Sequence, residues 1–326
     1  MMNYENFKEV VKESFMDYMP EKYKKATLKI REINKVNCVL DGITLTGVIK
    51  GISPTIYIND MYNHYMNCGN IDKVLRVAAK TMEEGFINTP NDIDSLTNFN
   101  DAVTESIKNN IVFQFVNTEQ NKELLKIAPH REFQDLSIVY RWVVRIEKES
   151  IQSTIITNEL ANKFNLTEQQ LYNLAYVNTA NIFPPVVKSM NDVIYDLFMD
   201  NGISAEEIKA AGALPLEQEM WVITNDRGIN GAASILYTDV LSNLADKLDS
   251  DLYILPSSVH EVITVSSKSS VSKDVDDLAQ MVHEINMTQV ELDERLSNQV
   301  YFYDRTTQQI SLATNTEFKR LDNKQN

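Results

Sequence analysis

The sequence predicts an α+β fold, in which mixed strands and hairpins accompany a central helical cluster. Segments rich in β-branched residues come in neighbouring pairs with turn residues nearby, as in 26–33 and 37–49 with Asp41-Gly42. Helical signals concentrate in residues 157–211. Because strands and helices are grouped and do not alternate regularly, an α+β arrangement is favoured over a regularly wound α/β sheet.

The first half of the chain is expected to begin with an amphipathic helix. Phe7, Val11 and Phe15 fall on one face of this helix, and Pro20 ends it. Further helices are expected at 60–67, 71–85, 99–109 and 119–125, and further strands at 54–58, 111–115, 136–146 and 151–156. The last two strands can pair as a hairpin.

The second half is expected to open with helices and to continue with alternating elements. Thr167 with Gln170, and Ser204 with Glu207, have the spacing of capping boxes at helix starts. A helix is expected from Pro184-Pro185 to about residue 198. Strands at 221–224, 251–255 and 259–265, helices at 231–248 and 278–285, and a terminal hairpin of 300–303 with 310–312 follow.

The length of 326 residues favours two domains. The change of character near residue 157 predicts an N-terminal α+β domain over 1–156 and a C-terminal α+β domain over 157–318. Residues 319–326 are expected to form a disordered tail. The sequence leaves open whether the two halves pack as one core.

The composition indicates an ordinary globular protein of the cytoplasm. A net charge of −15 argues against general nucleic-acid binding, which needs a basic face. The N-terminus lacks a secretory signal, and no apolar run reaches the roughly 20 residues of a membrane helix. Cys38 and Cys68 are widely spaced, as is typical of reduced thiols in a cytosol.

The segment 254–262 is the most distinctive stretch of the chain and contains the candidate catalytic residues. Ser257, Ser258, His260 and Glu261 supply hydroxyls, an imidazole and a carboxylate within five residues. In an extended strand Ser258 and His260 point to the same face, as a serine nucleophile and its base would require. Gly-x-Ser-x-Gly is missing, so the other interpretation is a strand end whose serines satisfy backbone groups.

The loop 226–231 contains the candidate ligand-binding residues Arg227, Gly228, Asn230 and Gly231. It lies between an expected strand and an expected helix, where glycines and a helix N-terminus can bind an anion. It matches neither GxGxxG nor a P-loop, so a tight structural connection is the alternative.

Metal and cofactor sites are not expected. His260-Glu261 and His283-Glu284 begin like the motif HExxH. However, Thr264 and Met287 occupy the fifth position of the motif, where the second histidine would stand. No cofactor motif is evident.

Short segments along the chain carry a resemblance to a known family: 57–59, Asn117 and Asn121, 129–130, 135–136, 171–172 with 178–179, 224–225, 231–232 with 236–237, 254–261 and 300–304. The Leu-Pro-Ser-Ser-x-His-Glu segment is the distinctive one among them. Over about residues 3–312 the chain resembles an uncharacterised bacterial family of unknown function from anaerobic low-GC Gram-positive bacteria. The resemblance implies a bacterial cytosolic protein and supplies no catalytic residues that could be transferred to this chain.

From these observations we expect a non-catalytic protein-binding or regulatory accessory factor with an unknown protein partner. The alternative is a serine-dependent hydrolase that uses Ser257 or Ser258 with His260. An exposed apolar patch would favour the first hypothesis. A pocket that joins the serine, the histidine and a third polar group would favour the second.

Overall fold

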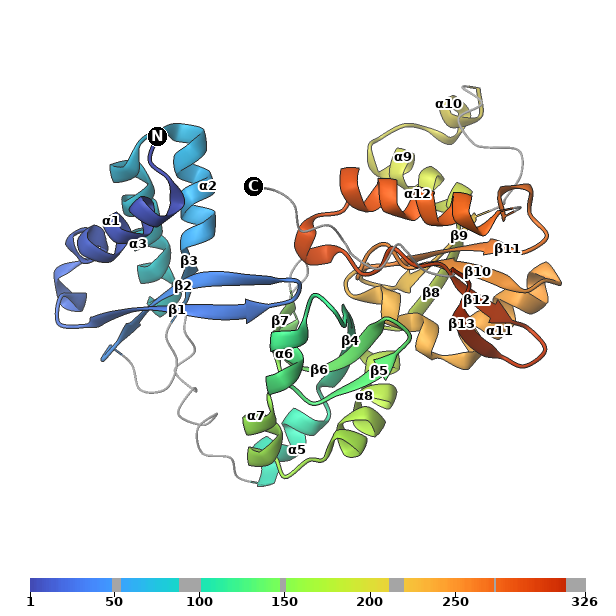
Figure 1. Cartoon of the computed structure of the whole chain (residues 1–326), viewed down its shortest axis with the longest axis horizontal. Coiled ribbons are helices and arrows are strands. Elements are labelled where there is room, and N and C mark those ends of the chain that lie inside the picture. The colour runs from blue at the N-terminus through green and yellow to red at the C-terminus, as the bar shows by residue number, and fades with distance from the viewer. Residues whose placement is uncertain (49–53, 88–100, 147–150, 211–219, 273, 315–326) are drawn as a thin grey trace. The chain divides into compact units, whose positions relative to one another are not determined.

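The computed structural model describes residues 1–48, 54–87, 101–146, 151–210, 220–272 and 274–314 (Figure 1). The chain divides into two compact units, Met1–Glu105 and Ser106–Asn326. Each unit is described by itself. The expected tail at 319–326 lies outside the described residues.

The first unit combines helices with a small antiparallel sheet, sheet A, in the order β1-β2-β3. Phe7, Val11 and Phe15 are buried in its core, as their spacing on the first helix predicts. Asn3 caps that helix by accepting a hydrogen bond from the Asn6 amide at 2.9 Å. The elements are α1 (Tyr4–Tyr18), η1 (Glu21–Tyr23), β1 (Thr27–Lys35), β2 (Cys38–Thr46), β3 (Ile56–Tyr57), α2 (Ile58–Cys68) and α3 (Ile71–Ile87).

The second unit contains two antiparallel sheets with their helices. The boundary between the two units falls within helix α5 (Asp101–Lys108). Sheet B consists of β4 (Ile111–Asn117), β6 (Leu136–Ile146) and β5 (His130–Phe133) in that order, and β7 (Ile151–Ile155) also pairs with β6. Helix α6 (Lys122–Ile127) lies between β4 and β5, and α7 (Asn158–Lys163) and α8 (Glu168–Ile182) follow β7.

Sheet C has the strand order β13-β12-β10-β11-β9-β8. Its strands are β8 (Pro185–Ser189), β9 (Met220–Asn225), β10 (Leu252–Leu255), β11 (Val262–Ser266), β12 (Tyr301–Asp304) and β13 (Gln309–Leu312). Its α-helices are α9 (Met190–Asp200), α10 (Ala205–Ala210), α11 (Thr238–Leu248) and α12 (Val275–Thr288). Short 3-10 turns are η2 (Gly231–Leu236), η3 (Ser270–Ser272) and η4 (Leu292–Glu294).

Sheets B and C share one hydrophobic core. Phe113 and Tyr140 of sheet B belong to the same buried cluster as Ile223 and Ile254 of sheet C. This shared core explains why both sheets belong to the unit that begins at Ser106. The sequence had instead indicated a boundary after residue 156. Every strand pair among the described residues is antiparallel, and helices lie between and after the hairpins, which confirms the α+β class.

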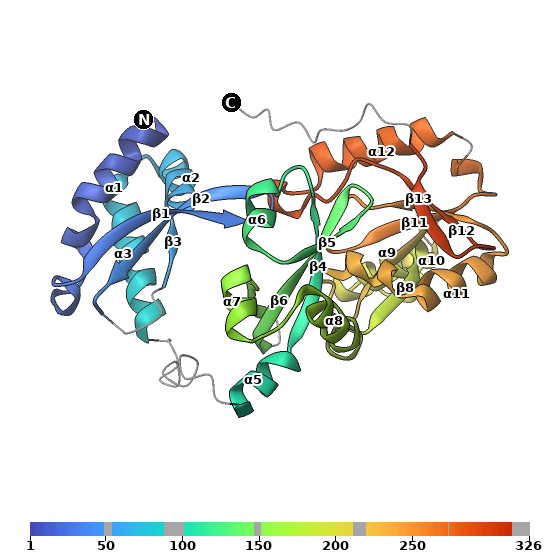
Figure 2. The ribbon, with the colours of Figure 1, turned by 60° about the horizontal axis from the view of Figure 1, so that its bottom comes forward.

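Helices cover both faces of sheet C. Figures 1 and 2 show α11 on one side of the strands and α12 on the other. Leu241 and Leu244 of α11 join the core shared with sheet B. Leu278 and Val282 of α12 instead pack in a separate cluster that includes Val265. Both hydrophobic faces of the sheet are therefore covered at β10 and β11.

Several local predictions are confirmed, and one helix begins later than expected. The capping boxes of Thr167 with Gln170 and of Ser204 with Glu207 are present. The hairpin of β12 and β13 also forms. However, residues 185–189 form the edge strand β8 where the sequence predicts the first turn of a helix. Pro185 is tolerated there because an edge strand does not need every backbone amide.

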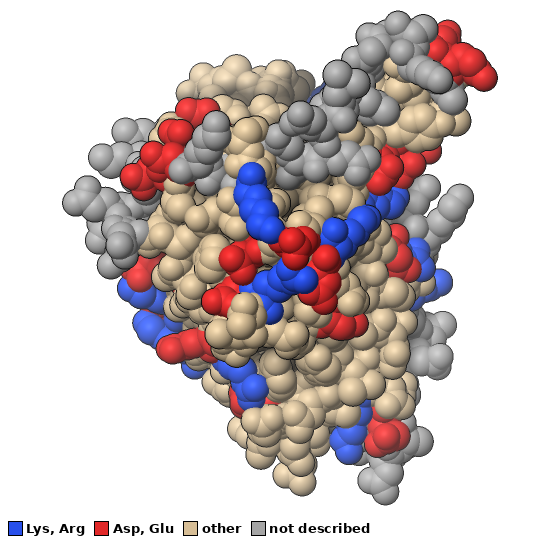
Figure 3. Space-filling model, turned by 90° about the vertical axis from the view of Figure 1, so that its right-hand side faces the viewer, with Lys and Arg blue, Asp and Glu red and all other residues tan. Residues whose placement is uncertain are grey.

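Charges of both signs meet around the turn between β12 and β13. Arg305 contacts Asp249 and also Asp246, the latter at 2.8 Å, while Lys268 approaches Asp249 at 3.2 Å. Figure 3 views this side of the molecule and shows acidic and basic side chains intermingled. Because these ion pairs are exposed to solvent, they contribute little to stability and do little more than balance charge at the end of α11.

Candidate functional site

The 256–261 segment runs beside the segment that follows η4 and is held to it by backbone hydrogen bonds. The amide of Val259 donates to the Glu294 carbonyl at 2.9 Å, and the amide of Leu296 donates to the Ser257 carbonyl at 2.9 Å. Ser258 also forms an isolated antiparallel bridge with Arg295. These bonds bury Ser257 and Ser258. The segment is thus part of a packed backbone ladder.

The imidazole of His260 joins this segment to the loop 226–231. Its Nδ1 accepts a hydrogen bond from the Asn230 amide at 3.3 Å, and its Nε2 lies 3.1 Å from Oε1 of Glu294. In the neutral ring this geometry puts the proton on Nε2, where it donates to the carboxylate. The structure therefore brings the two sequence-predicted candidate segments together, through Asn230 and His260.

The relation between Ser258 and His260 runs through the backbone. The Ser258 hydroxyl accepts a hydrogen bond from the His260 amide at 3.0 Å. Ser258 is only 5% exposed, and both ring nitrogens of His260 have other partners. This hydroxyl stabilises a turn, which is the role that the strand-end interpretation assigns to it.

The loop 226–231 is organised by Asn225, which the sequence reasoning missed. Its side-chain Nδ2 donates to the Ile229 carbonyl at 2.8 Å, and its Oδ1 accepts from the Arg227 amide at 3.0 Å. An asparagine at a strand end before a glycine-containing turn typically forms such hydrogen bonds, so the sequence contained a signal for this loop structure. Arg227 itself is exposed.

Gly231 is required by a close approach of three segments. A Cβ atom there would lie 2.3 Å from Oγ1 of Thr224 and 2.6 Å from the carbonyl oxygen of His260. Thr224 Oγ1 also donates to that carbonyl at 2.8 Å. Gly228 has a φ of +64°, and no atom lies within 4 Å of its hypothetical Cβ. The two glycines thus have different roles.

An open cavity of about 720 Å³, which we call the α9 cavity, lies beside these segments. Two of the predicted candidates, Gly228 and Glu261, contribute to its wall. The complete described lining is Val186, Lys188, Met190, Val193, Asp196, Leu197, Asp200, Val222, Thr224, Asn225, Asp226, Gly228, Glu261 and Ile263. Its size is within the range of about 300–1,000 Å³ that is typical of small-ligand sites.

Alternating residues of three neighbouring strands form the floor of the α9 cavity. Lys188, Val222 and Ile263 are directly opposite one another across β8, β9 and β11. Val186 and Thr224 form the next row on the same face. Since side chains two apart share a face of a strand, the intervening residues point to the opposite face of the sheet.

Helix α9 forms the other wall of the cavity. It begins with a capping box between Ser189 and Asp192. Its lining residues recur at spacings of three and four, which places them on one face of the helix: Met190, Val193, Asp196, Leu197 and Asp200. Within the described part of the chain, none of its side chains is buried, and Leu197 is 60% exposed.

The charge of the α9 cavity is predominantly acidic. Asp196, Asp200, Asp226 and Glu261 contribute carboxyl groups, while Lys188 contributes an ammonium group that is bonded to Asp196 at 2.6 Å. Burial raises the pKa of the Glu261 carboxyl, although the nearby His260 and a hydrogen bond with Ser258 act to lower it. The described lining therefore contains more carboxyl groups than positive groups, and Glu261 is the least exposed of these carboxylate residues.

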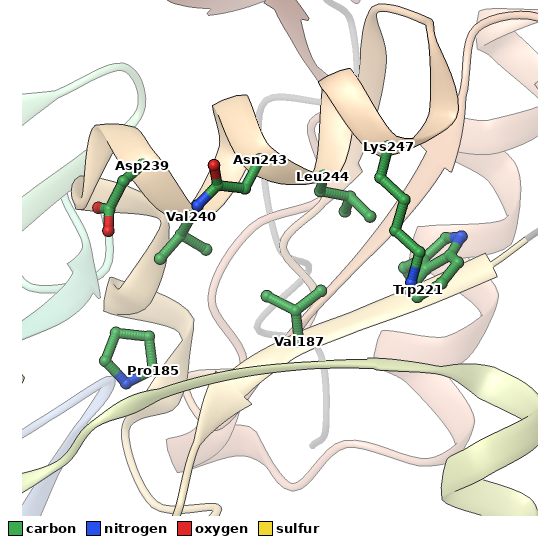
Figure 4. A pocket seen from close by; sticks show the side chains of 8 residues that line it. All are labelled: Pro185, Val187, Trp221, Asp239, Val240, Asn243, Leu244 and Lys247. Carbon is green, nitrogen blue, oxygen red and sulfur yellow. The ribbon is translucent and has the colours of Figure 1, made fainter.

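A second, smaller cavity of about 360 Å³ lies on the opposite face of sheet C. Figure 4 shows its wall on α11 and its floor on β8 and β9, with Lys247 lying over the ring of Trp221. The Lys247 nitrogen is 4.1 Å from the ring centroid. None of the sequence-predicted candidates lines this cavity.

Among the residues that the structure describes, no group of three or more His, Cys, Asp or Glu side chains could hold a metal ion. None of the helices in the described ranges has the length and apolar character needed to cross a bilayer.

The geometry defines an antiparallel α+β protein with an open apolar cavity whose polar groups are mainly carboxyls. The chain belongs to a family of unknown function (DUF5688), whose model matches residues 4–305. Membership of a family of unknown function is what the resemblance in the sequence implied. The curated proteins and the solved structures provide no match to this chain.

Proposed function

We propose that this protein is a non-catalytic protein-binding or regulatory accessory factor, and that its partner docks at the α9 cavity. One observation carries the proposal. Helix α9 presents apolar side chains, of which none is buried in the described part of the chain, over a hollow of about 720 Å³. Apolar surface of this kind is costly to leave in water unless a partner covers it.

The arrangement of polar groups around the cavity supports binding over catalysis. A general base must reach the proton that it abstracts, whereas both ring nitrogens of His260 already contact Asn230 and Glu294. Ser258 is buried and accepts from a backbone amide. Thr224 and Asn225, which also line the cavity, bond to the backbone of neighbouring segments.

The test is site-specific photo-crosslinking in lysate of the source organism. A benzoylphenylalanine at position 197, on α9, should form a discrete adduct with one protein. The same group at position 287, on α12, is the matched control because Met287 is also exposed. The partner identified by mass spectrometry should then bind as a purified protein, and Val193→Trp, which fills the cavity, should weaken that binding. Identical adducts from both positions would contradict the proposal.

The alternative function is a serine-dependent hydrolase that uses Ser257 or Ser258 with His260. It is favoured by the closeness of Ser258 and His260 to Glu261, which lines the α9 cavity, and by the raised pKa of the Glu261 carboxyl. A fluorophosphonate probe tests it. A hydrolase should label in the wild type, and the label should be lost in Ser258→Ala or Ser257→Ala and reduced in His260→Ala. An unlabelled wild type would count against a nucleophilic serine.

We also infer a bacterial, cytoplasmic protein that does not bind nucleic acid generally. The support is the resemblance of segments such as 254–261 to a bacterial family, the wide spacing of Cys38 and Cys68, and the net charge of −15. Cell fractionation followed by immunodetection tests the location. Recovery with the secreted fraction would contradict it.

A further inference from the structure

We propose that the occupant of the α9 cavity is a partner segment that carries a lysine or arginine flanked by apolar residues. The inference rests on the proposed function and names the chemistry of its ligand. The basic group binds the carboxyl groups of Glu261 and Asp226 in the cavity lining, and its aliphatic stem lies along the apolar floor.

The balance of charge excludes an anionic occupant. The described lining contains the carboxyl groups of Asp196, Asp200, Asp226 and Glu261 against the single ammonium of Lys188. That ammonium is already bonded to Asp196. An acidic ligand would meet net repulsion, whereas a cation would meet three carboxyls that Lys188 does not neutralise.

The position of Glu261 shows which carboxyl gains most from a cation. It directly precedes β11, next to the floor residue Thr224, whose hydroxyl bonds to the carbonyl of His260. Its side chain is half-buried, and burial raises its pKa, which reports an incompletely compensated charge. A basic group beside this carboxyl would add a cationic partner to the hydrogen bond that it has with Ser258.

The apolar part of the cavity matches the remainder of such a segment. Val222 and Ile263 on the floor face Val193 and Leu197 of α9 across the hollow. Lysine and arginine bury an aliphatic stem while the charged head reaches a polar group, so one side chain can use both features. Flanking apolar residues would cover Leu197, which is otherwise 60% exposed.

The experiment uses the full chain with methyl-labelled methionine and leucine, and follows the signals of Met190 and Leu197 by NMR. Three pentapeptide pools have four positions randomised among Ala, Val, Leu and Phe and a central residue fixed as lysine, norleucine or glutamate. Norleucine keeps a comparable aliphatic stem without the ammonium. The lysine pool should bind about tenfold more tightly than the norleucine pool, and the glutamate pool should not bind.

Variants assign the preference to the residues named. Glu261→Gln and Asp226→Asn should each reduce the ratio of lysine to norleucine affinity. Asp277→Asn is the matched control, because Asp277 is an exposed acid in the first turn of α12 and does not line the cavity. A ratio that survives both cavity variants overturns the assignment of the cation to these carboxyls.

The outcomes separate this inference from the proposed function. Equal binding of the lysine and norleucine pools overturns the basic occupant and leaves a protein-docking site in place. The absence of shifts with every pool contradicts the inference, while the crosslinking from position 197 decides the proposed function by itself. Pentylamine that binds as tightly as the lysine pool would assign the cavity to small amines. A self-crosslinked dimer from position 197 would assign it to a second copy of the chain.

Discussion

Helices α9 and α11 have equal lengths and pack against opposite faces of sheet C, yet their apolar residues have different surroundings. Helix α11 buries Val240, Leu241, Leu244 and Ala245 in the core shared with sheet B. Helix α9 has more apolar and aromatic residues, seven of its 11 against five of 11, but none is buried in the described part of the chain. The difference teaches that an apolar helix face predicts a need for cover and does not say what supplies it.

The largest effect should come from truncating a leucine on each helix. Leu241→Ala removes a side chain that is 1% exposed, and should lower the free energy of unfolding by about 2–5 kcal/mol. Leu197→Ala should change it by less than about 0.5 kcal/mol, because the side chain is exposed. Urea denaturation followed by circular dichroism measures both. Equal losses would mean that α9 is packed as tightly as α11.

Enlarging a side chain on each helix should have opposite results. Ala245→Leu adds volume to a fully buried position on α11 and should destabilise the protein by about 1–3 kcal/mol. Val193→Leu adds volume next to the hollow of the α9 cavity and should be neutral or stabilising by up to about 2 kcal/mol. Thermal unfolding compares the two variants. Destabilisation by Val193→Leu would show that the hollow cannot accept a larger side chain.

The two helices should also differ in the free energy of local opening. Few of the contacts that hold α9 are buried, so its amides should exchange with solvent at least about tenfold faster than those of α11, which corresponds to about 1.4 kcal/mol in opening free energy. Hydrogen exchange followed by mass spectrometry over the two helices provides the measurement. Protection of α9 on adding the lysine peptide pool would tie its opening to the cavity.

The smallest effect concerns Glu261 and pH. Burial raises the pKa of this carboxyl in the folded protein, so the folded state binds its proton more tightly than the unfolded state. The stability that this proton contributes is present at low pH and is lost as pH rises through the folded pKa. The stability of wild type relative to Glu261→Gln should therefore fall as pH rises above the ordinary carboxyl range. A constant difference from pH 4 to pH 8 would contradict the raised pKa.

Local signals predicted much of the secondary structure correctly. The capping boxes at Thr167 and Ser204 involve residues three apart, so they depend little on the rest of the chain. The prediction failed at 185–189, where Pro184-Pro185 suggested a helix start. That segment pairs instead with β9, and the sequence near the prolines contains no information about a partner strand.

The candidate site shows the same limit at longer range. From the sequence, the loop 226–231 and the segment 256–261 were two separate candidates. The loop was considered for anion binding, and the segment for serine-dependent hydrolysis. In the structure they meet, because Gly231 lets its backbone approach Thr224 and the carbonyl of His260. The lining residues Met190, Val193 and Leu197 were not selected, although their helical spacing was visible.

The sequence by itself determined the α+β class, the helix starts marked by the capping boxes at Thr167 and Ser204, and the strand-end position of Ser257 and Ser258, because these depend on neighbouring residues and on hydrophobic periodicity. Only the tertiary structure decided that Asn230 bonds the ring of His260, that the units divide after Glu105 and that α9 overlies a hollow. These features depend on contacts between residues far apart in the chain. Packing selects such contacts for the fold as a whole, and no local pattern encodes them.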